Sequence, residues 1–193
     1  MSNKHKVIIH TAMSLDGFVA GLGDDLSWVF NHSEPTLDLS KHIASIGAVV
    51  MGRRTQEVDI KQRSNPEKNF VYGGEYDGPV FVLSDEPNDQ ERDPRVRYIS
   101  GDIAEKIKDI IKAADGGNVV LLGATVWREC LEAGVVDEIL IHVVPVLLGD
   151  GIRFYSVPGA QLMELELIES LQIGKIAQLR FKVKKTNDTQ GIT

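Results

Sequence analysis

Five short runs of apolar residues, spaced along the chain between turn signals, set the strongest limit on its fold. The runs are rich in valine, isoleucine and leucine, and they cover residues 7–12, 48–51, 80–83, 119–122 and 139–146. Runs that are this short and this rich in β-branched residues favour buried strands over helices. We therefore expect five buried strands.

Helical patterns lie between these runs. The clearest covers residues 102–117, where apolar residues recur at helical spacing on one face while Glu and Lys occupy the other. Asp102 and Glu105 predict a capping box at its start, and Gly116 predicts its end. A second helix is expected over residues 126–133.

Two other stretches give weaker signals. Residues 37–46 predict a third helix that stops at Gly47. Residues 59–78 are rich in Lys, Asn, Gly and charge, and this composition predicts one long surface loop.

Towards the C-terminus the pattern changes from continuous to alternating. Apolar and polar residues alternate in residues 162–167 and again in residues 177–183, on either side of a turn at Gly174. This alternation predicts a half-buried antiparallel hairpin. Alternating strands and helices followed by a hairpin predict an α/β sandwich with a mixed sheet. We expect one domain over residues 1–185 and a disordered tail over residues 186–193, which lack apolar content.

Composition excludes several classes of protein. The net charge of -7 argues against a general nucleic-acid binder, because no basic face is available to displace phosphate counterions. Cys130 is the only cysteine, so we expect no intrachain disulfide and no cysteine-based metal site. The N-terminal apolar stretch is too short for a signal peptide, and no run approaches a membrane span. We expect a cytoplasmic protein with no metal and no membrane partner.

The segment TAMSLDGFVAG, residues 11–21, places Asp16 just beyond the carboxyl end of the first expected strand. Ligands of open α/β sheets bind at such ends, where a carboxylate could hold a substrate amide or amidine. The alternative is that Asp16 and Gly17 form a turn in which Asp16 bonds its own backbone. Local chemistry alone favours the turn.

In VVMGRRT, residues 49–55, a buried strand runs into Gly52 and then into Arg53, Arg54 and Thr55. A glycine lets the backbone approach a ligand, the first amides of a helix bind phosphate oxygens, and a guanidinium binds phosphate bidentately. Solvated surface explains the arginines about as well. In an acidic protein, however, an anionic ligand needs such a local cluster of positive charge.

A similar junction occurs in NVVLLGATVWREC, where Gly123 and Ala124 join a strand to a helix that begins near Thr125. This arrangement can also bind an anion, but the signal is weak by itself. The pair Gly149 and Gly151 follows a strand without a helix behind it, which favours a structural turn over a dinucleotide fingerprint.

Five segments, in the order SLDG, MGRRT, VFVLS, LLGAT and VDEILIHVVPVLLGDG, resemble the dihydrofolate reductase superfamily. More narrowly, the chain resembles relatives of the reductase domain of the riboflavin-biosynthesis deaminase-reductase. The resemblance runs from about residue 6 to residue 184. It implies a dihydrofolate reductase-like three-layer sandwich, with a mostly parallel central sheet and a C-terminal antiparallel hairpin.

The resemblance also implies NADPH as the cofactor. In the family, the segment that matches residues 52–55 grips the cofactor phosphates, the strand end at residues 83–84 lies along the adenosine ribose, and residues 123–126 pass under the pyrophosphate. The cofactor-binding residues implied in this way are Ala12, Gly52, Arg53, Arg54, Thr55, Leu83, Ser84, Gly123, Ala124, Thr125 and Val126.

For the substrate, the resemblance implies that residues 16–28 cover the nicotinamide and the substrate. Asp16 matches a carboxylate that faces the substrate and is the expected catalytic residue, with Gly17 and Trp28 as further substrate contacts. Two positions depart from the family pattern. Phe18 stands where a basic residue is usual, which weakens the case for a phosphoribosylated substrate. Ala124 replaces the second glycine of a pair, which is a milder change.

Three functions follow as hypotheses. The first is an NADPH-dependent reductase of a pterin- or pyrimidine-like heterocycle, related to 5-amino-6-(5-phosphoribosylamino)uracil reductase. The second is a non-catalytic nucleotide- or pterin-binding protein that keeps the cofactor pocket. The third is a structural dimer with a vestigial site, which the two adjacent arginines disfavour. We also expect a homodimer, because the strand at residues 139–148 and the following hairpin carry more apolar surface than one small sheet face needs.

Overall fold

The computed structural model describes residues 5–185, so the tail expected over residues 186–193 lies outside the described residues. The chain divides into two compact units. Of the described residues, the first unit contains residues 5–8 and 39–135, and the second contains residues 9–38 and 136–185. No helix in the described part of the chain is long and apolar enough to cross a membrane.

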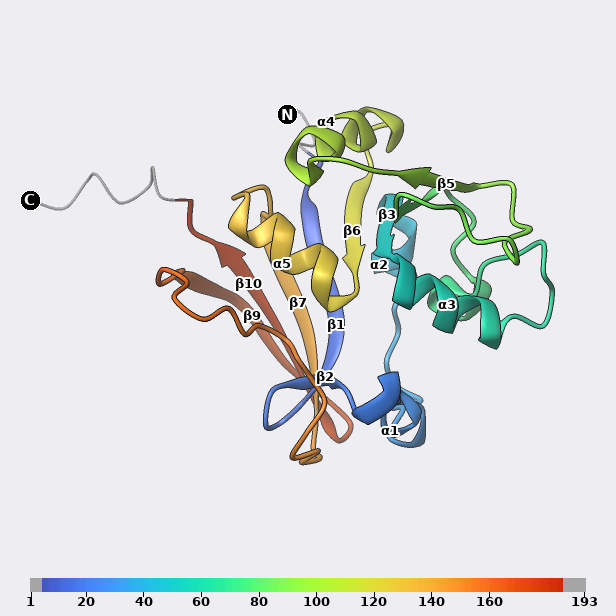
Figure 1. Ribbon diagram of the computed structural model, residues 1–193. Coiled ribbons are helices and arrows are strands. Elements are labelled where there is room, and N and C mark those ends of the chain that lie inside the picture. Colours follow the sequence, from blue (N-terminus) through green and yellow to red (C-terminus); the bar gives the residue numbers. More distant parts are fainter. Residues whose placement is uncertain (1–4, 186–193) are drawn as a thin grey trace, which may run out of the picture. The chain divides into compact units, whose positions relative to one another are not determined.

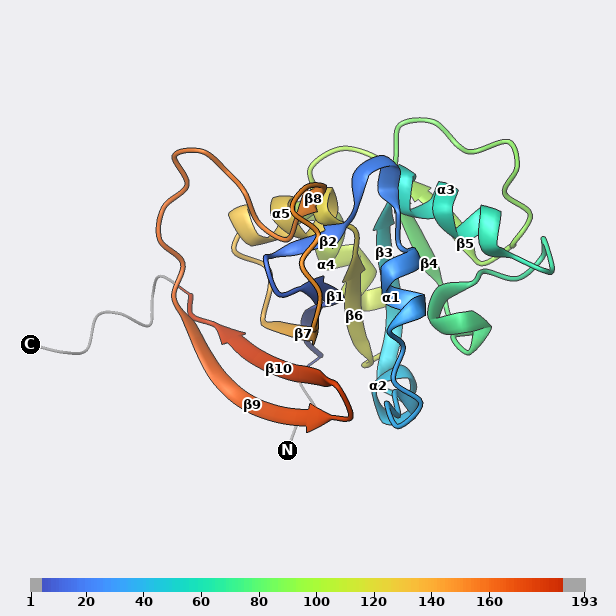
Figure 2. The ribbon, with the colours of Figure 1, turned by 90° about the horizontal axis from the view of Figure 1, so that it is seen from below.

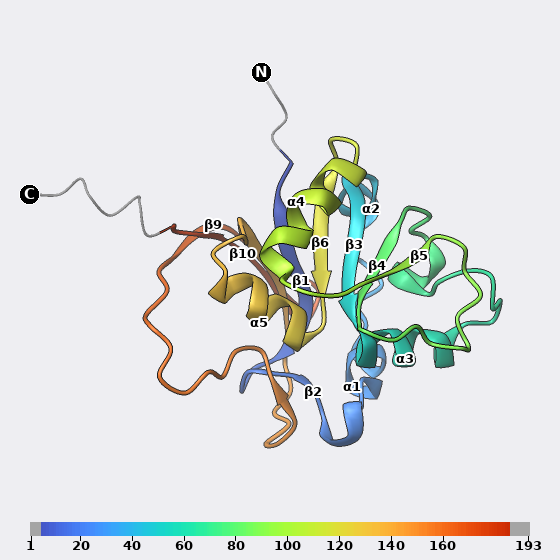
Figure 3. The same ribbon diagram turned by 45° about the horizontal axis from the view of Figure 1, so that its top comes forward.

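The first unit is built on parallel strands. They lie in the order β5-β4-β3-β6, followed by the start of β1 (Figure 1 and Figure 3). Their bounds are Val7–Ser14 for β1, Ile46–Gly52 for β3, Val80–Leu83 for β4, Val96–Ile99 for β5 and Asn118–Leu122 for β6. β3 pairs in parallel with both β4 and β6. Its residues 48–51 are fully buried, as their continuous apolar run predicts.

Helices cover these strands. The helices of the first unit are α2 (Ser40–Ala44), α3 (Arg53–Gln62), α4 (Ile103–Ala113) and α5 (Ala124–Glu132), with a short 3-10 turn at Val71–Gly74. α4 and α5 lie together on one face of β3 and β6 (Figure 3). α4 begins where the capping pattern predicts, because the Asp102 carboxylate accepts a hydrogen bond from the Glu105 amide at 3.0 Å.

The second unit contains β1, β7 (Glu138–Val144), β10 (Ile176–Val183) and β9 (Leu165–Ile173), in that order across the sheet. β10 is antiparallel to both β7 and β9, and β9 is the outer strand of the hairpin (Figure 2). β2 (Phe18–Ala20) pairs with β8 (Ile152–Arg153), and the short helices are Leu22–Asp24 and α1 (Ser27–Asn31). The mostly parallel sheet with an antiparallel C-terminal hairpin is confirmed.

The helix expected over residues 37–46 is wrong in extent. Only Ser40–Ala44 is helical, and Gly47 lies inside β3 and does not end a helix. A Cβ atom at Gly47 would stand 2.0 Å from the backbone oxygen of Ala114. The glycine is therefore there because β3 packs against the end of α4, a contact that no local pattern could show.

The surface loop expected over residues 59–78 is also wrong. α3 continues to Gln62, and Asn69, Val71 and Tyr76 are buried. The segment is polar because it is held by buried hydrogen bonds. The Asp59 carboxylate accepts from the Phe70 amide at 2.8 Å, for example.

The C-terminal hairpin is present, but its burial is uneven. β10 is partly buried between its neighbours, whereas β9 is exposed on both faces along almost its whole length. The exposed apolar side chains of β9 are Leu165, Leu167, Ile168 and Leu171.

Candidate cofactor and substrate sites

Three strands of the first unit end at the same level. Gly52 of β3 is in register with Leu83 of β4, and Met51 with Leu122 of β6. The residues that follow these ends, including Arg53 and Ser84, therefore lie along one carboxyl edge. Ligands of open α/β sheets bind at this edge.

The junction between β3 and α3 places the start of a helix at this edge. Gly52 is the N-cap residue of α3, and no side chain of the described residues caps this helix start. The first amides of a helix lack intrahelical acceptors and carry the positive end of the helix dipole. Arg53 and Arg54 begin the helix and are exposed. A ten-residue helix with this start can bind an anion.

The junction between β6 and α5 has the same design and touches the first one. Gly123 is the N-cap residue of α5 and adopts a φ of 92°, which favours glycine. A Cβ atom at Gly123 would lie 2.3 Å from Thr55 Oγ1, and one at Gly52 would lie 3.5 Å from Val126 Cγ2. The structure thus brings the two helix starts together. Four residues from the two predicted junctions meet there: Gly52, Thr55, Gly123 and Val126.

The Arg53 side chain faces a groove beside α3. The groove has a volume of about 440 Å³ and is lined by Arg53, Glu57, Lys61, Glu86, Pro87, Asn88, Asp89 and Gln90. Ser84 precedes the lining segment, and its hydroxyl donates to the Glu86 carbonyl at 2.8 Å and accepts from the Glu86 amide at 3.3 Å. The Ser84 hydroxyl, expected to contact the ribose, is engaged in this turn.

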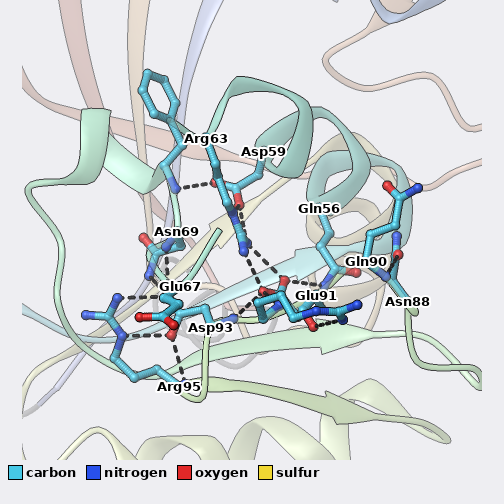
Figure 4. Close-up of polar contacts among 12 residues, drawn as sticks. Gln56, Asp59, Arg63, Glu67, Asn69, Asn88, Gln90, Glu91, Asp93 and Arg95 are labelled. Atoms are coloured by element: carbon cyan, nitrogen blue, oxygen red, sulfur yellow. Dashed lines mark hydrogen bonds and ion pairs between the residues drawn. The ribbon is translucent and has the colours of Figure 1, made fainter. Parts of the chain in front are cut away.

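A buried charged cluster lies next to the segment that lines the groove (Figure 4). The Arg63 side chain is 3% exposed and bonds to Asp59 at 2.7 Å and to Glu91 at 2.9 Å. Gln56 donates to the same Glu91 carboxylate at 2.8 Å and to Tyr98 Oη at 2.6 Å. Glu91 directly follows Gln90, the last residue of the lining, so these bonds hold the end of that segment against α3.

The electrostatics of the cluster follow from its burial. Burial opposes ionisation of Glu91, but its hydrogen bonds from Arg63 and neighbouring amides outweigh burial and lower its pKa. At Asp59 burial dominates and raises the pKa. Sequence reasoning missed this cluster. Its one visible signal is the spacing of Asp59 and Arg63, which is that of an ion pair along a helix.

A second cluster lies beside the first. The Asp93 carboxylate accepts from the Asn69 amide at 2.7 Å and from Arg95 at 2.9 and 2.8 Å. Burial opposes its ionised form, yet the bonds from Arg95 and Asn69 prevail and lower the pKa of Asp93 to about 2. This arrangement fixes the segment that the sequence presented as a surface loop.

In the second unit, the Asp16 carboxylate is hydrogen-bonded to the loop after β7. Its carboxylate accepts from Ser14 Oγ at 2.6 Å, from the Leu148 amide at 3.1 Å and from the Gly149 amide at 2.7 Å. The Ser14 hydroxyl, together with these amides, lowers the pKa of Asp16 to about 2. Gly17, with a φ of 89°, closes the turn onto the Ser14 carbonyl. Asp16 and Gly17 therefore lie in a turn, but the Asp16 carboxylate bonds distant amides, where the turn interpretation had it bond its own backbone. An ionised Asp16 is no proton donor at neutral pH.

A role for Asp16 towards substrate stays a prediction. We expect Asp16→Asn to lower turnover about 10- to 100-fold, the value of a lost charge-assisted hydrogen bond, with little change in NADPH affinity. The matched control is Asp102→Asn, because Asp102 lies outside this loop and its carboxylate also accepts from a nearby backbone amide. Steady-state kinetics and a binding titration measure the two quantities. An equal loss of NADPH binding would show that the assignment to substrate is wrong.

Phe18, one of the two departures from the family pattern, has the guanidinium of Arg153 over the face of its ring. Arg153 of β8 pairs with Phe18 of β2, and its guanidinium carbon lies 4.5 Å from the centre of the Phe18 ring. Arg153 Nη1 also donates to the Asp16 carbonyl at 3.5 Å. A guanidinium from a distant strand thus stands beside the position where the family has a basic residue.

Trp28 is a core residue of the second unit. Its side chain packs with Val144 and Ile176, and Ala12 packs against the same cluster. Within the described residues, its indole nitrogen is buried without a hydrogen-bond partner. The roles of Trp28 in substrate binding and of Ala12 in cofactor binding stay predictions.

Comparison with known proteins places the chain in a family. The RibD C-terminal domain family matches residues 58–179, more than half of the chain, beginning just after the Arg53–Arg54 segment. The uncharacterised protein YwjB of Bacillus subtilis (strain 168) is 26% identical over 180 residues, which cover 92% of this chain and 98% of YwjB.

Solved structures show the same fold. A protein from Shewanella sp. PV-4, provisionally named a riboflavin biosynthesis protein, superposes with a TM-score of 0.78 at 24% identity and covers 93% of this chain and 99% of its own. Dihydrofolate reductase from Enterococcus faecalis complexed with NADP(H) gives a TM-score of 0.57 at 15% identity, covering 96% and 99%. The expected fold is confirmed: this chain has a dihydrofolate reductase-like fold and belongs to the RibD C-terminal domain family.

Proposed function

We propose that the protein is a cytoplasmic, NADPH-dependent reductase of a pterin- or pyrimidine-like heterocycle, related to 5-amino-6-(5-phosphoribosylamino)uracil reductase. The observation that carries this proposal is the contact between the two helix starts at the carboxyl edge of the sheet. Gly123 and Thr55 come so close that a Cβ atom at Gly123 would clash with Thr55 Oγ1 at 2.3 Å.

The residues of the first unit fit a dinucleotide. The amides at the starts of α3 and α5 would hold the pyrophosphate, and Arg53 and Arg54 would supply the positive charge that an acidic protein otherwise lacks. When bound, NADPH supplies the hydride, whereas the protein provides orientation and excludes water. The turn held by Asp16 fixes the loop that follows β1.

The proposed substrate class rests on the family and on Arg153. A deaminase/5-amino-6-(5-phosphoribosylamino)uracil reductase from Thermotoga maritima shares the fold with a TM-score of 0.63 at 18% identity, and this chain covers 57% of its length. The exposed guanidinium of Arg153, stacked on Phe18, supports an anionic substituent on the heterocycle.

The state of Asp16 favours an alternative: a non-catalytic nucleotide- or pterin-binding protein. Reduction of a heterocycle needs a proton as well as a hydride. Asp16 is the carboxylate that the sequence offers for this role, and its pKa of about 2 leaves it ionised.

Oxidation of NADPH, followed by absorbance against a panel of heterocycles, separates the two functions. The panel should contain dihydropterin, dihydrofolate and 5-amino-6-ribosylaminouracil with and without its 5′-phosphate. We expect oxidation with at least one of them, and the reaction without heterocycle is the control. Saturable NADPH binding without oxidation by any panel member would reject the reductase in favour of the binding protein.

We further propose a homodimer formed through β9. This strand is nine residues long, lies at the edge of the sheet and exposes Leu167 by 54% and Leu171 by 46%. Exposed apolar edge strands invite pairing with another chain. Sedimentation should show a species of twice the 21.3 kDa chain mass, and Leu167→Lys should weaken it, whereas Leu22→Lys, at another exposed leucine, should not. A concentration-independent 21.3 kDa species would contradict this prediction.

A further inference from the structure

We propose that Glu86 is a specificity-determining residue that limits the preference of the protein for NADPH over NADH. This inference rests on the proposed function, because it assumes that the groove beside α3 receives the adenosine end of the cofactor. It assigns to Glu86 an effect on the 2′-position of the adenosine ribose, where the two cofactors differ by one phosphate.

The first observation is the position of the Arg53 guanidinium between two carboxylates. Arg53 Nε lies 3.3 Å from Glu57 Oε1, and Arg53 Nη1 lies 3.7 Å from Glu86 Oε2. Glu57 is one turn further along α3, while Glu86 approaches from the segment after β4. A phosphate that binds the Arg53 guanidinium must therefore compete with two carboxylates, which carry the same sign of charge as the phosphate.

The net charge of the groove lining also disfavours a bound 2′-phosphate. Its lining contains two cations, Arg53 and Lys61, and three carboxylates, which belong to Glu57, Glu86 and Asp89. The lining is thus net negative, although it contains the arginine expected to hold the 2′-phosphate. A ribose 2′-hydroxyl, in contrast, can donate a hydrogen bond to a carboxylate, which is how acidic residues favour NAD over NADP in other dinucleotide sites.

Hydrogen bonds hold the backbone at Glu86, whose carboxylate lies 3.7 Å from Arg53 Nη1. The Ser84 hydroxyl bonds both the carbonyl and the amide of Glu86. Further along the same segment, Glu91 is tied to Arg63 in the buried cluster. The Glu86 side chain itself is 82% exposed, so it can be replaced without disturbing the core, and salt will screen its effect.

The test uses two probes that differ only in the 2′-phosphate: adenosine 2′,5′-bisphosphate and adenosine 5′-monophosphate. Their affinities are measured by calorimetry at low salt for the full chain, for Glu86→Gln and for Glu132→Gln, which removes the same charge from an exposed position at the end of α5. We expect Glu86→Gln to raise the affinity for the bisphosphate roughly two- to tenfold and to change the affinity for the monophosphate less than about twofold. Glu132→Gln should change neither, and the gain should shrink as salt is added.

Equal tightening of both probes, or an unchanged bisphosphate affinity, would overturn the role of Glu86. Failure of either probe to bind the wild-type protein would overturn it too, because the groove would then not receive adenosine. If the probes respond as expected while NADPH reduces no heterocycle, the role of Glu86 stands and only the proposed reductase activity fails.

Discussion

Replacing Arg63 with methionine is expected to lower the free energy of unfolding by about 3–5 kcal/mol. The Arg63 side chain is buried between the carboxylates of Asp59 and Glu91, whose side chains are 8% and 7% exposed. Methionine fills a similar volume but leaves both carboxylates without their cation. The loss follows from two uncompensated charges in a place where water does not reach them. Urea denaturation followed by circular dichroism measures it.

Arg92→Met is the matched control for this prediction. Arg92 belongs to the same segment, but its side chain is exposed and, among the described residues, bonds backbone carbonyls at Glu91 and Asp89. Its replacement should change the free energy of unfolding by less than about 1 kcal/mol. If Arg63→Met were as mild as Arg92→Met, the buried cluster would not stabilise the segment that lines the groove.

Replacing both Arg53 and Arg54 with alanine is expected to weaken NADPH binding about 10- to 100-fold and NADH binding much less. A charge-assisted hydrogen bond to phosphate contributes about 1.5–3 kcal/mol, and NADH lacks the 2′-phosphate. Both arginines stand at the start of α3, where the helix amides add to their effect. Fluorescence titration with each cofactor measures the two affinities.

Arg128→Ala serves as the control, because Arg128 is an exposed arginine on α5 outside the groove lining. It should leave both affinities unchanged. Equal losses of NADPH and NADH in the double variant would mean that the arginines do not recognise the 2′-phosphate. The same conclusion would follow if the wild-type protein bound NADH as tightly as NADPH.

Much of the fold could be predicted because its strands have recognisable local sequence patterns. The run Val80–Leu83 matches β4 residue for residue, since a short β-branched run between turn signals has few other stable conformations. The two strand-glycine-helix junctions were predicted for a similar reason. A strand, a glycine and a helix in succession form a pattern within ten residues, as at Gly123.

The errors occur where distant partners decide the structure. A polar segment is predicted as surface unless its partners are known, and the partner of Arg63 is Glu91, 28 residues further along the chain. Asp16 shows the same limit. Its sequence suggested a turn or a site, but the amides that lower its pKa come from Leu148 and Gly149, more than 130 residues away. Gly47 also depends on a remote contact, with Ala114.

Titration of the wild-type protein with NADPH, followed by tryptophan fluorescence, tests the central claim most directly. The chain has two tryptophans, and Trp127 lies on α5, whose start is proposed to bind the pyrophosphate. We expect saturable quenching with one NADPH per chain and a weaker response to NADH. The absence of saturable binding up to about 1 mM NADPH, which corresponds to a free energy of only about -4 kcal/mol, would contradict the claim that this family member binds the cofactor.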